Sequence, residues 1–275
     1  MKTVKELNWS FSSLGCPELN LEEIVRLAKQ YGIGGLELRT VEDRVDMPAL
    51  FSERFGSPEN LNDWLVEASM RIQALDSSLK LVGNSAEDRD AFLEFVEWAE
   101  ALDVPSLRVF DGGTYDASTL SDEDLAQALE TINWWRSLRQ KHGWNSDIII
   151  ETHDCLTATP AIQQLQSHLD DPQMILWDTH HTWKKGGEDP RETWQAIRQW
   201  VNHVHVKDSV SKPSARHPFS YIMLGEGEFD LGGTLSMFAE SGYEGIVSLE
   251  WERKWHPYLE PLSDALAKAR EFGWL

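Results

Sequence analysis

Eight times along this chain of 275 residues, a short apolar run is followed by a longer segment in which apolar residues recur at helical spacing. In residues 21–31, apolar residues recur at positions i, i+3, i+4 and i+7, as in an amphipathic helix: Leu21, Ile24, Val25 and Ala28. Strands that alternate with helices predict a parallel sheet with the helices outside it. We expect strands at residues 7–14, 36–38, 72–75, 106–110, 147–151, 174–178, 203–206 and 246–250, and helices at residues 21–31, 61–70, 90–101, 122–138, 161–169, 191–201, 232–239 and 262–272.

Eight such units favour a closed barrel over an open doubly wound sheet, which usually has fewer strands. Barrels of this kind commonly use about 250 residues as one domain. No low-complexity linker, tandem repeat or shift of composition divides the chain. It also lacks a G-x-G-x-x-G loop after the first strand and a G-K-[ST] phosphate loop. The predicted fold class is therefore α/β, a single (β/α)8 TIM barrel over residues 1–275.

Charge and composition exclude several classes of function. The net charge of −21, from 46 acidic and 25 basic residues, disfavours binding to the phosphate backbone of nucleic acids. No stretch has the roughly 18 apolar residues that a membrane span needs, and the first residues lack the apolar run of a signal peptide. Two cysteines, Cys16 and Cys155, do not suggest a disulfide framework. We expect a cytoplasmic protein that acts on neither nucleic acid nor membrane.

The last four predicted strands share a feature that bears on function, since each ends in a polar side chain able to bind a metal: Glu151, Asp178, His205 and Glu250. The carboxyl ends of the strands form the active-site face of a barrel. A carboxylate at the end of an apolar strand is costly to bury unless it is paired or bound to a cation. We expect one divalent metal ion here. The alternative is a salt-bridged polar plug with Arg39 and Arg108.

Three carboxylates and one imidazole form a mixed oxygen and nitrogen set. Such ligands suit Mn, Mg, Co, Fe(II) or Zn, and the sequence does not choose among them. His203 and His205 lie on the same side of their strand. We take His205 as the ligand because it lies nearer the carboxyl end, and we expect His203 to be a buried, hydrogen-bonded barrel residue.

Several segments together resemble the xylose-isomerase-like barrels: CPELNLEEIVRLAKQYGIGGLELR near the start, then IIIETHD, LWDTHH, HVHVKD, LGEGEFDL and GYEGIVSLEWE. The most similar group is that of the sugar phosphate isomerase/epimerase-type proteins, which includes ketose 3-epimerases, hydroxypyruvate isomerases and inosose dehydratases. The resemblance covers nearly the whole chain. It implies the same four metal ligands, and it implies a substrate contact by His181, three residues after Asp178. It also implies that Glu151 and Glu250 act as the acid and base groups.

The resemblance leads us to expect a metal-dependent isomerase or epimerase that acts on a sugar or small hydroxy-ketone. Proton transfer beside the carbonyl would form an enediolate, whose charge a metal ion can stabilise. A dehydratase or lyase of an inosose-like polyol ketone or a dehydroshikimate-like acid is the alternative, because it begins with the same proton abstraction. A non-catalytic sugar-binding barrel is less favoured, since the ligand set is complete. A nuclease with three zinc ions is disfavoured because strands one to four supply no histidine.

Other polar and aromatic side chains near the strand ends are expected to contact a small-molecule carbohydrate or hydroxy-ketone substrate. Arg216 and Lys207 would orient its oxygens, and Trp183 would form an apolar wall. Glu37 and Arg108 either shape the substrate site or form interstrand salt bridges. The segment from Trp251 to Pro257 is long for its position, which suggests a lid or a subunit contact. Barrels of this type often form dimers or tetramers, so a homo-oligomer is included in the expectation.

Overall fold

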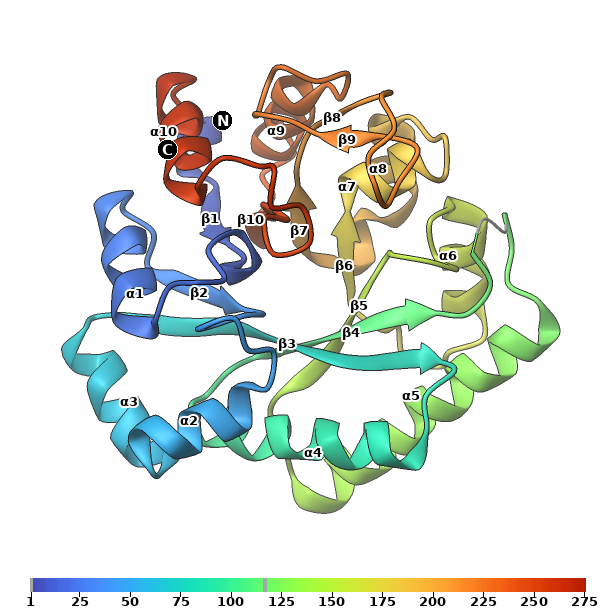
Figure 1. Cartoon of the computed structure of the whole chain (residues 1–275). Helices are drawn as coiled ribbons and strands as arrows, with labels where there is room; N and C mark the ends of the chain where they lie inside the picture. The colour runs from blue at the N-terminus through green and yellow to red at the C-terminus, as the bar shows by residue number, and fades with distance from the viewer. Residues whose placement is uncertain (1, 116–117) are drawn as a thin grey trace.

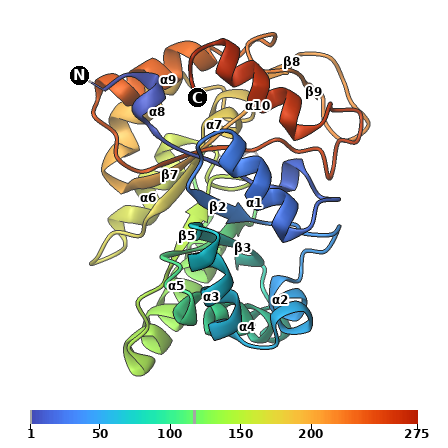
Figure 2. The same ribbon diagram turned by 90° about the vertical axis from the view of Figure 1, so that its left-hand side faces the viewer.

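The structure is a computed structural model that describes residues 2–115 and 118–275. Within these residues, eight strands form one sheet in the order β1-β10-β7-β6-β5-β4-β3-β2. Figures 1 and 2 show the helices arranged around the outside of these strands. The strands are β1 (Asn8–Phe11), β2 (Gly35–Leu38), β3 (Arg71–Val82), β4 (Ser106–Gly112), β5 (Asp147–Glu151), β6 (Ile175–Asp178), β7 (Val201–Val206) and β10 (Ile246–Leu249).

Helices connect the consecutive strands of the main sheet, as a parallel sheet requires, and the last helix follows the last strand. They are α1 (Leu21–Gln30), α2 (Met47–Phe55), α3 (Pro58–Glu67), α4 (Ala86–Ala101), α5 (Asp122–His142), α6 (Thr159–Ser167), α7 (Thr179–Lys184), α8 (Pro190–Ile197), α9 (Leu231–Glu240) and α10 (Leu262–Glu271). Short 3-10 turns occupy Val4–Glu6, Ser13–Gly15 and Arg198–Trp200, and β8 (Ser209–Val210) pairs with β9 (Ser220–Tyr221) as a small antiparallel ribbon.

The sheet closes into a barrel through its first two strands. Neighbouring strands of the main sheet pair in parallel, and a parallel bridge between Ser12 and Glu37 joins the chain after β1 to β2. The prediction of a (β/α)8 TIM barrel is thereby confirmed. Closure matters for the site because it brings Glu37, near the start of the chain, beside β7 from its second half.

Local sequence explains why the helices begin where they do. Asn20 and Glu23 form a reciprocal capping box at the start of α1, with Asn20 Oδ1 accepting from the Glu23 N–H at 2.9 Å. Leu21 and Ile24 on the apolar face of α1 are completely buried. Asp178 has a second local role, because its side chain accepts from the His181 N–H and caps α7.

The structure differs from the expected elements in a few places. β3 extends to Val82, seven residues beyond the predicted end, and β1 ends at Phe11, ahead of a 3-10 turn. Helices α2 and α7 and the β8–β9 ribbon were not predicted. The remaining elements agree to within about four residues at each end.

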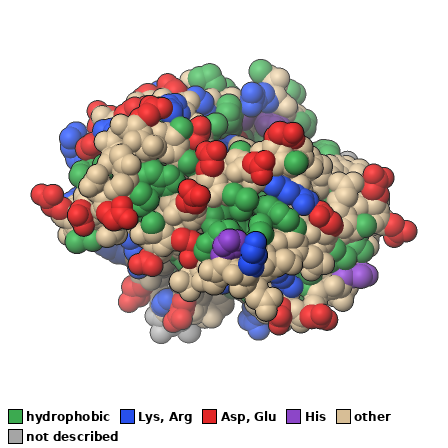
Figure 3. All heavy atoms as spheres, turned by 90° about the horizontal axis from the view of Figure 1, so that it is seen from below, with side chains coloured by type: hydrophobic (Ala, Val, Ile, Leu, Met, Phe, Trp, Pro, Cys, Tyr) green, Lys and Arg blue, Asp and Glu red, His purple; other side chains and the backbone are tan. Residues whose placement is uncertain are grey.

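The surface carries the excess negative charge of the sequence. On the face shown in Figure 3, carboxylate side chains are spread over the surface, with fewer basic side chains among them. In the part of the chain that the structure describes, no helix is both long enough and apolar enough to cross a membrane.

Candidate metal centre and active site

Four side chains converge at the carboxyl ends of neighbouring strands. Glu151 ends β5, Asp178 ends β6, His205 lies in β7 and Glu250 directly follows β10. The sheet register places Asp178 opposite His205. One nitrogen or oxygen atom from each of the four lies within 4.8 Å of the others, and all four residues are buried. The residues that the sequence singled out as ligands therefore form one cluster.

The donor atoms of this cluster fit a divalent cation. His205 Nδ1 makes no hydrogen bond, and it lies 3.2 Å from Glu250 Oε2 and 3.6 Å from Glu151 Oε1. Glu151 Oε2 is also buried without a hydrogen bond. Burial raises the pKa of Asp178 to about 6, although the Lys207 ammonium acts against this rise. Three carboxylates buried around one imidazole form a site that a bound cation would stabilise.

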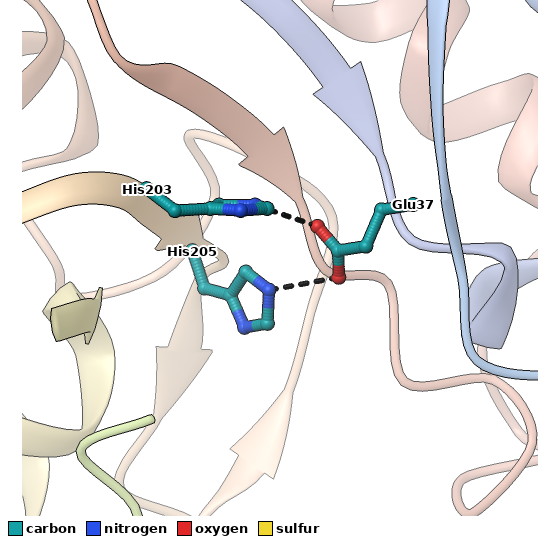
Figure 4. Close-up of side chains that lie close together, drawn as sticks. All are labelled: Glu37, His203 and His205. Atoms are coloured by element: carbon teal, nitrogen blue, oxygen red, sulfur yellow. Dashed lines mark hydrogen bonds and ion pairs between the residues drawn. The ribbon is translucent and has the colours of Figure 1, made fainter. Parts of the chain in front are cut away.

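Glu37 orients the histidine of this cluster, as Figure 4 shows. Its Oε1 lies 2.9 Å from His205 Nε2, and its Oε2 lies 2.7 Å from His203 Nε2. Burial alone would raise the pKa of Glu37, but the two histidines hold it well below its usual value. A carboxylate that accepts from Nε2–H leaves the Nδ1 lone pair of His205 for a metal. Glu37 was expected either to shape the substrate site or to form a salt bridge, and the structure places it against the two histidines.

Lys207 places a buried positive charge on two of the same carboxylates. Its Nζ lies 2.6 Å from Asp178 Oδ2 and 2.7 Å from Glu252 Oε1, and it also contacts Glu250 Oε2. The side chain is only 1% exposed. Burial lowers the pKa of Lys207, but Asp178 and Glu250 outweigh burial and hold it well above its usual value. The ammonium thus shares Asp178 and Glu250 with the candidate metal centre.

A small, partly open cavity of about 50 Å³ adjoins the cluster. Its lining combines charged groups with apolar walls: Leu14, Arg39, Arg108, Phe110, Glu151, His153, His181, Glu250, Glu252 and Trp255. The mixture of a few polar groups and aromatic walls is typical of small-molecule sites. The cavity is small enough that a ligand in it would lie against Glu151 and Glu250.

The expected substrate residues fall at different distances from this cavity. Arg108 and His181 line it. Arg216 is exposed, and its guanidinium carbon lies 5.4 Å from the ring centre of Trp255, a lining residue. Trp183 packs against Phe229, with ring centres 5.2 Å apart, and does not line the cavity.

His153 is a cavity residue that the sequence analysis missed. Its Nδ1 lies 2.9 Å from Asp154 Oδ1, and its ring centre lies 4.9 Å from that of His181. Asp111 holds the surrounding loop, because its carboxylate accepts from the backbone N–H of His153, Asp154 and Leu156. Burial lowers the pKa of His153, but the bond to Asp154 and the negative charges of Glu151 and Asp154 together outweigh burial and raise it above its usual value. The one available signal was its place two residues after Glu151.

Asp208 has a structural role in the loop that follows β7. Its two carboxylate oxygens accept from the N–H groups of Gly225, Gly227 and Phe229. Gly227 has no room for a side chain, since a Cβ there would lie 1.9 Å from Asp208 Oδ1. The Gly225-Glu226-Gly227 segment therefore forms a turn around the Asp208 carboxylate.

Comparison with known proteins gives the chain its family. The model of the family described as xylose isomerase-like TIM barrel matches residues 25–273. A 3-dehydroshikimate dehydratase from Bacillus anthracis is 25% identical over 240 residues, which cover 84% of this chain and 80% of that protein.

Solved structures share the fold over nearly the whole length of the chain. The crystal structure of the probable 3-DHS dehydratase AsbF from Bacillus anthracis has a TM-score of 0.76 at 19% identity, covering 96% of this chain and 98% of that one. The IOLI protein with a binding zinc atom has a TM-score of 0.73 at 17% identity, covering 98% and 96%. At these identities the structures establish the likeness of fold alone.

Proposed function

Because this chain belongs to the family of xylose isomerase-like TIM barrels, we propose that it is a divalent-metal-dependent dehydratase of a small cyclic hydroxy-ketone. The observation that carries the proposal is the convergence of Glu151, Asp178, His205 and Glu250 beside a small cavity. The sequence favoured isomerisation or epimerisation over dehydration. A curated relative that matches 84% of the chain is a dehydratase, and this places dehydration first.

The four clustered residues would hold the metal ion, with Glu37 fixing the imidazole of His205. When bound there, a divalent cation supplies Lewis-acid polarisation of the substrate's carbonyl group. Mn, Mg, Co, Fe(II) and Zn all suit a set of three carboxylates and one imidazole. His181 lines the cavity and also approaches Asp178, with Nδ1 and Oδ2 3.1 Å apart, so it is placed to orient a substrate oxygen beside the cluster.

Two groups on the cavity wall, Glu151 of the cluster and His153, would move the protons. Glu151 would accept the proton from the carbon beside the carbonyl, while Arg108, whose Nε lies 3.3 Å from Glu151 Oε2, keeps that carboxylate ionised beforehand. The bond of His153 Nδ1 to Asp154 leaves Nε2 to donate a proton to the hydroxyl group that departs. The carbon–hydrogen electrons form the new double bond, the carbon–oxygen bond breaks, and water leaves.

Epimerisation is the second candidate, and the position of Glu250 favours it. Glu250 and Glu151 both line the cavity, one from β10 and one from β5. Two carboxylates on different sides of a substrate can remove a proton from one face and return one to the other. In this alternative the hydroxyl group stays on the substrate, and His153 has no leaving group to protonate.

Deuterium exchange and product spectra test the proposal together. The protein, loaded with Mn²⁺, is incubated in D2O with 3-dehydroshikimate or an inosose, and the mixture is followed by ultraviolet absorption and mass spectrometry. Dehydration gives an unsaturated product that absorbs and has lost water. Deuterium incorporation without loss of water indicates epimerisation or isomerisation. If 3-dehydroshikimate, the inosose and a panel of ketohexoses all fail both to lose water and to exchange deuterium, the proposed function is wrong.

Variants test the assigned proton carriers. Glu151→Gln should lower turnover by about 10²- to 10⁴-fold, the range for loss of a general base. Glu226→Gln, a change in the exposed turn after the β8–β9 ribbon, is the matched control. Retention of near-native turnover by Glu151→Gln would contradict the assignment of the base. Glu250→Gln separates the two candidates when it is assayed at saturating metal, since epimerisation then still lacks its second proton carrier whereas dehydration keeps Glu151 as its base.

A further inference from the structure

Arg39 is a buried cation without an anionic partner. It follows β2 on the cavity wall and is 7% exposed. Its guanidinium donates one hydrogen bond, from Nη1 to the backbone oxygen of Asp76 at 3.1 Å. Among residues 2–115 and 118–275, no carboxylate oxygen lies within the 4.0 Å of an ion pair from its nitrogens. Burial and the neighbouring Arg108 lower the pKa of Arg39 to about 10.

The other arginine of the cavity, Arg108, is also buried, but its guanidinium is paired with carboxylates. Arg108 lies 3.3 Å from Glu151 and 3.7 Å from Asp76, and it is 1% exposed. A buried charge is normally paired because its desolvation is costly. Arg39 departs from this rule while its neighbour obeys it, and the difference points to a negative group supplied from outside the chain.

The residues that line the cavity indicate the chemistry of the rest of that ligand. Leu14, Phe110 and Trp255 give apolar surfaces, and Glu151 and Glu250 line the same space. A planar guanidinium matches one carboxylate through two parallel hydrogen bonds. A phosphate needs several charged donors, and apart from Arg39 the nitrogen donors of the lining are Arg108, which is already paired, two histidines and the uncharged indole of Trp255.

We propose that Arg39 binds a carboxylate group of the substrate, so that the site selects small cyclic hydroxy-ketone acids over neutral sugars and polyol ketones. This inference rests on the proposed function for the place where the ketone lies, but it concerns a different part of the substrate. Arg39 anchors the acid end while the hydroxy-ketone end reaches the four-residue cluster.

Binding measurements on the metal-loaded protein test the anchor separately from turnover. The dissociation constants of 3-dehydroshikimate, its neutral methyl ester and an inosose are measured by calorimetry for the wild type, Arg39→Gln and Arg39→Lys. Arg198→Gln, a change of an exposed arginine in the turn before β7, is the control. Circular dichroism and thermal melting confirm that each variant is folded.

The expected result is a loss of about 10- to 150-fold in affinity for the acid in Arg39→Gln, the range for a charged hydrogen-bonded pair. The affinity of Arg39→Gln for the inosose should change by less than about threefold. The affinity of Arg39→Lys for the acid should lie between those of the wild type and Arg39→Gln. In the wild type, the ester should bind more weakly than the acid by a similar factor, a comparison that needs no variant.

Three results would overturn the inference: equal binding of acid and ester, no binding of the acid, or tighter binding of the inosose or of a sugar phosphate. Binding of the acid through Arg39 with neither loss of water nor deuterium exchange would leave the anchor standing and remove the proposed reaction instead. The two proposals therefore fail in different ways.

Discussion

Replacing Glu37 with glutamine tests whether this residue prepares His205 for a metal ion. The substitution keeps the shape of the side chain but removes the negative charge that lies 2.9 Å from His205 Nε2 and 2.7 Å from His203 Nε2. A neutral amide is a weaker acceptor, so His205 becomes a poorer electron donor at Nδ1 and less firmly oriented. Loss of such a carboxylate partner typically lowers metal affinity by about 10- to 100-fold, which is about 1.4 to 2.7 kcal/mol.

Calorimetric titration of Mn²⁺ or Zn²⁺ into chelator-treated protein measures this affinity. Glu53→Gln is the matched control, because Glu53 is exposed in α2 and pairs with Arg44 far from the cluster. Glutamine at position 37 also leaves one buried histidine without a good acceptor, so the free energy of unfolding should fall by about 1 to 3 kcal/mol. A folded Glu37→Gln protein with metal affinity within twofold of the wild type would refute the reasoning.

Further predictions concern other features of the fold. Lys207→Met removes the ammonium that shares two carboxylates with the metal, so calorimetry should show tighter metal binding. The metal-free variant should melt at a lower temperature than the metal-free wild type. Weaker metal binding would mean that the ammonium supports the centre. Both cysteines are buried and burial raises the pKa of each thiol, so a thiol reagent at pH 8 should label them only after denaturation. Because the pKa of each thiol is higher in the folded state than in the unfolded state, the free energy of unfolding should fall as pH rises above the ordinary thiol value. Gly227→Ala would force a Cβ against Asp208 and should lower the free energy of unfolding in urea by about 1 to 3 kcal/mol, whereas Gly34→Ala, which meets open space, should have little effect.

The fold could be predicted because its signals are local and repeated. Apolar runs such as Ile148–Ile150 and the helical spacing in α1 each specify an element, and eight repeats leave few architectures. The end of β3 could not be predicted, since residues 76–78 are Asp-Ser-Ser and resemble a turn. Ser77 stays in the strand because its hydroxyl donates to the backbone oxygen of Arg108 at 2.8 Å, a contact that only the folded barrel provides.

The candidate ligands were visible in the sequence for the same topological reason. The carboxyl ends of parallel strands meet at one face, so Glu151 and Asp178 could be expected to approach each other before any coordinates existed. The groups that support these ligands could not be predicted from the sequence. Glu37 lies 168 residues from His205 in the sequence, and the pairing appears only when β2 closes against β1. His153 lies beyond the end of β5, where strand periodicity no longer tells which way a side chain points.

Metal analysis of the purified protein tests the central claim most directly. After chelation, reconstitution with Mn²⁺ or Zn²⁺ and removal of free ion, elemental analysis should find one ion per chain in the wild type. Asp178→Ala and His205→Ala, each checked for folding, should retain less than about one tenth of an ion, because each removes one of four converging donors. A wild-type protein without stoichiometric metal, or variants that keep a full ion, would contradict the account.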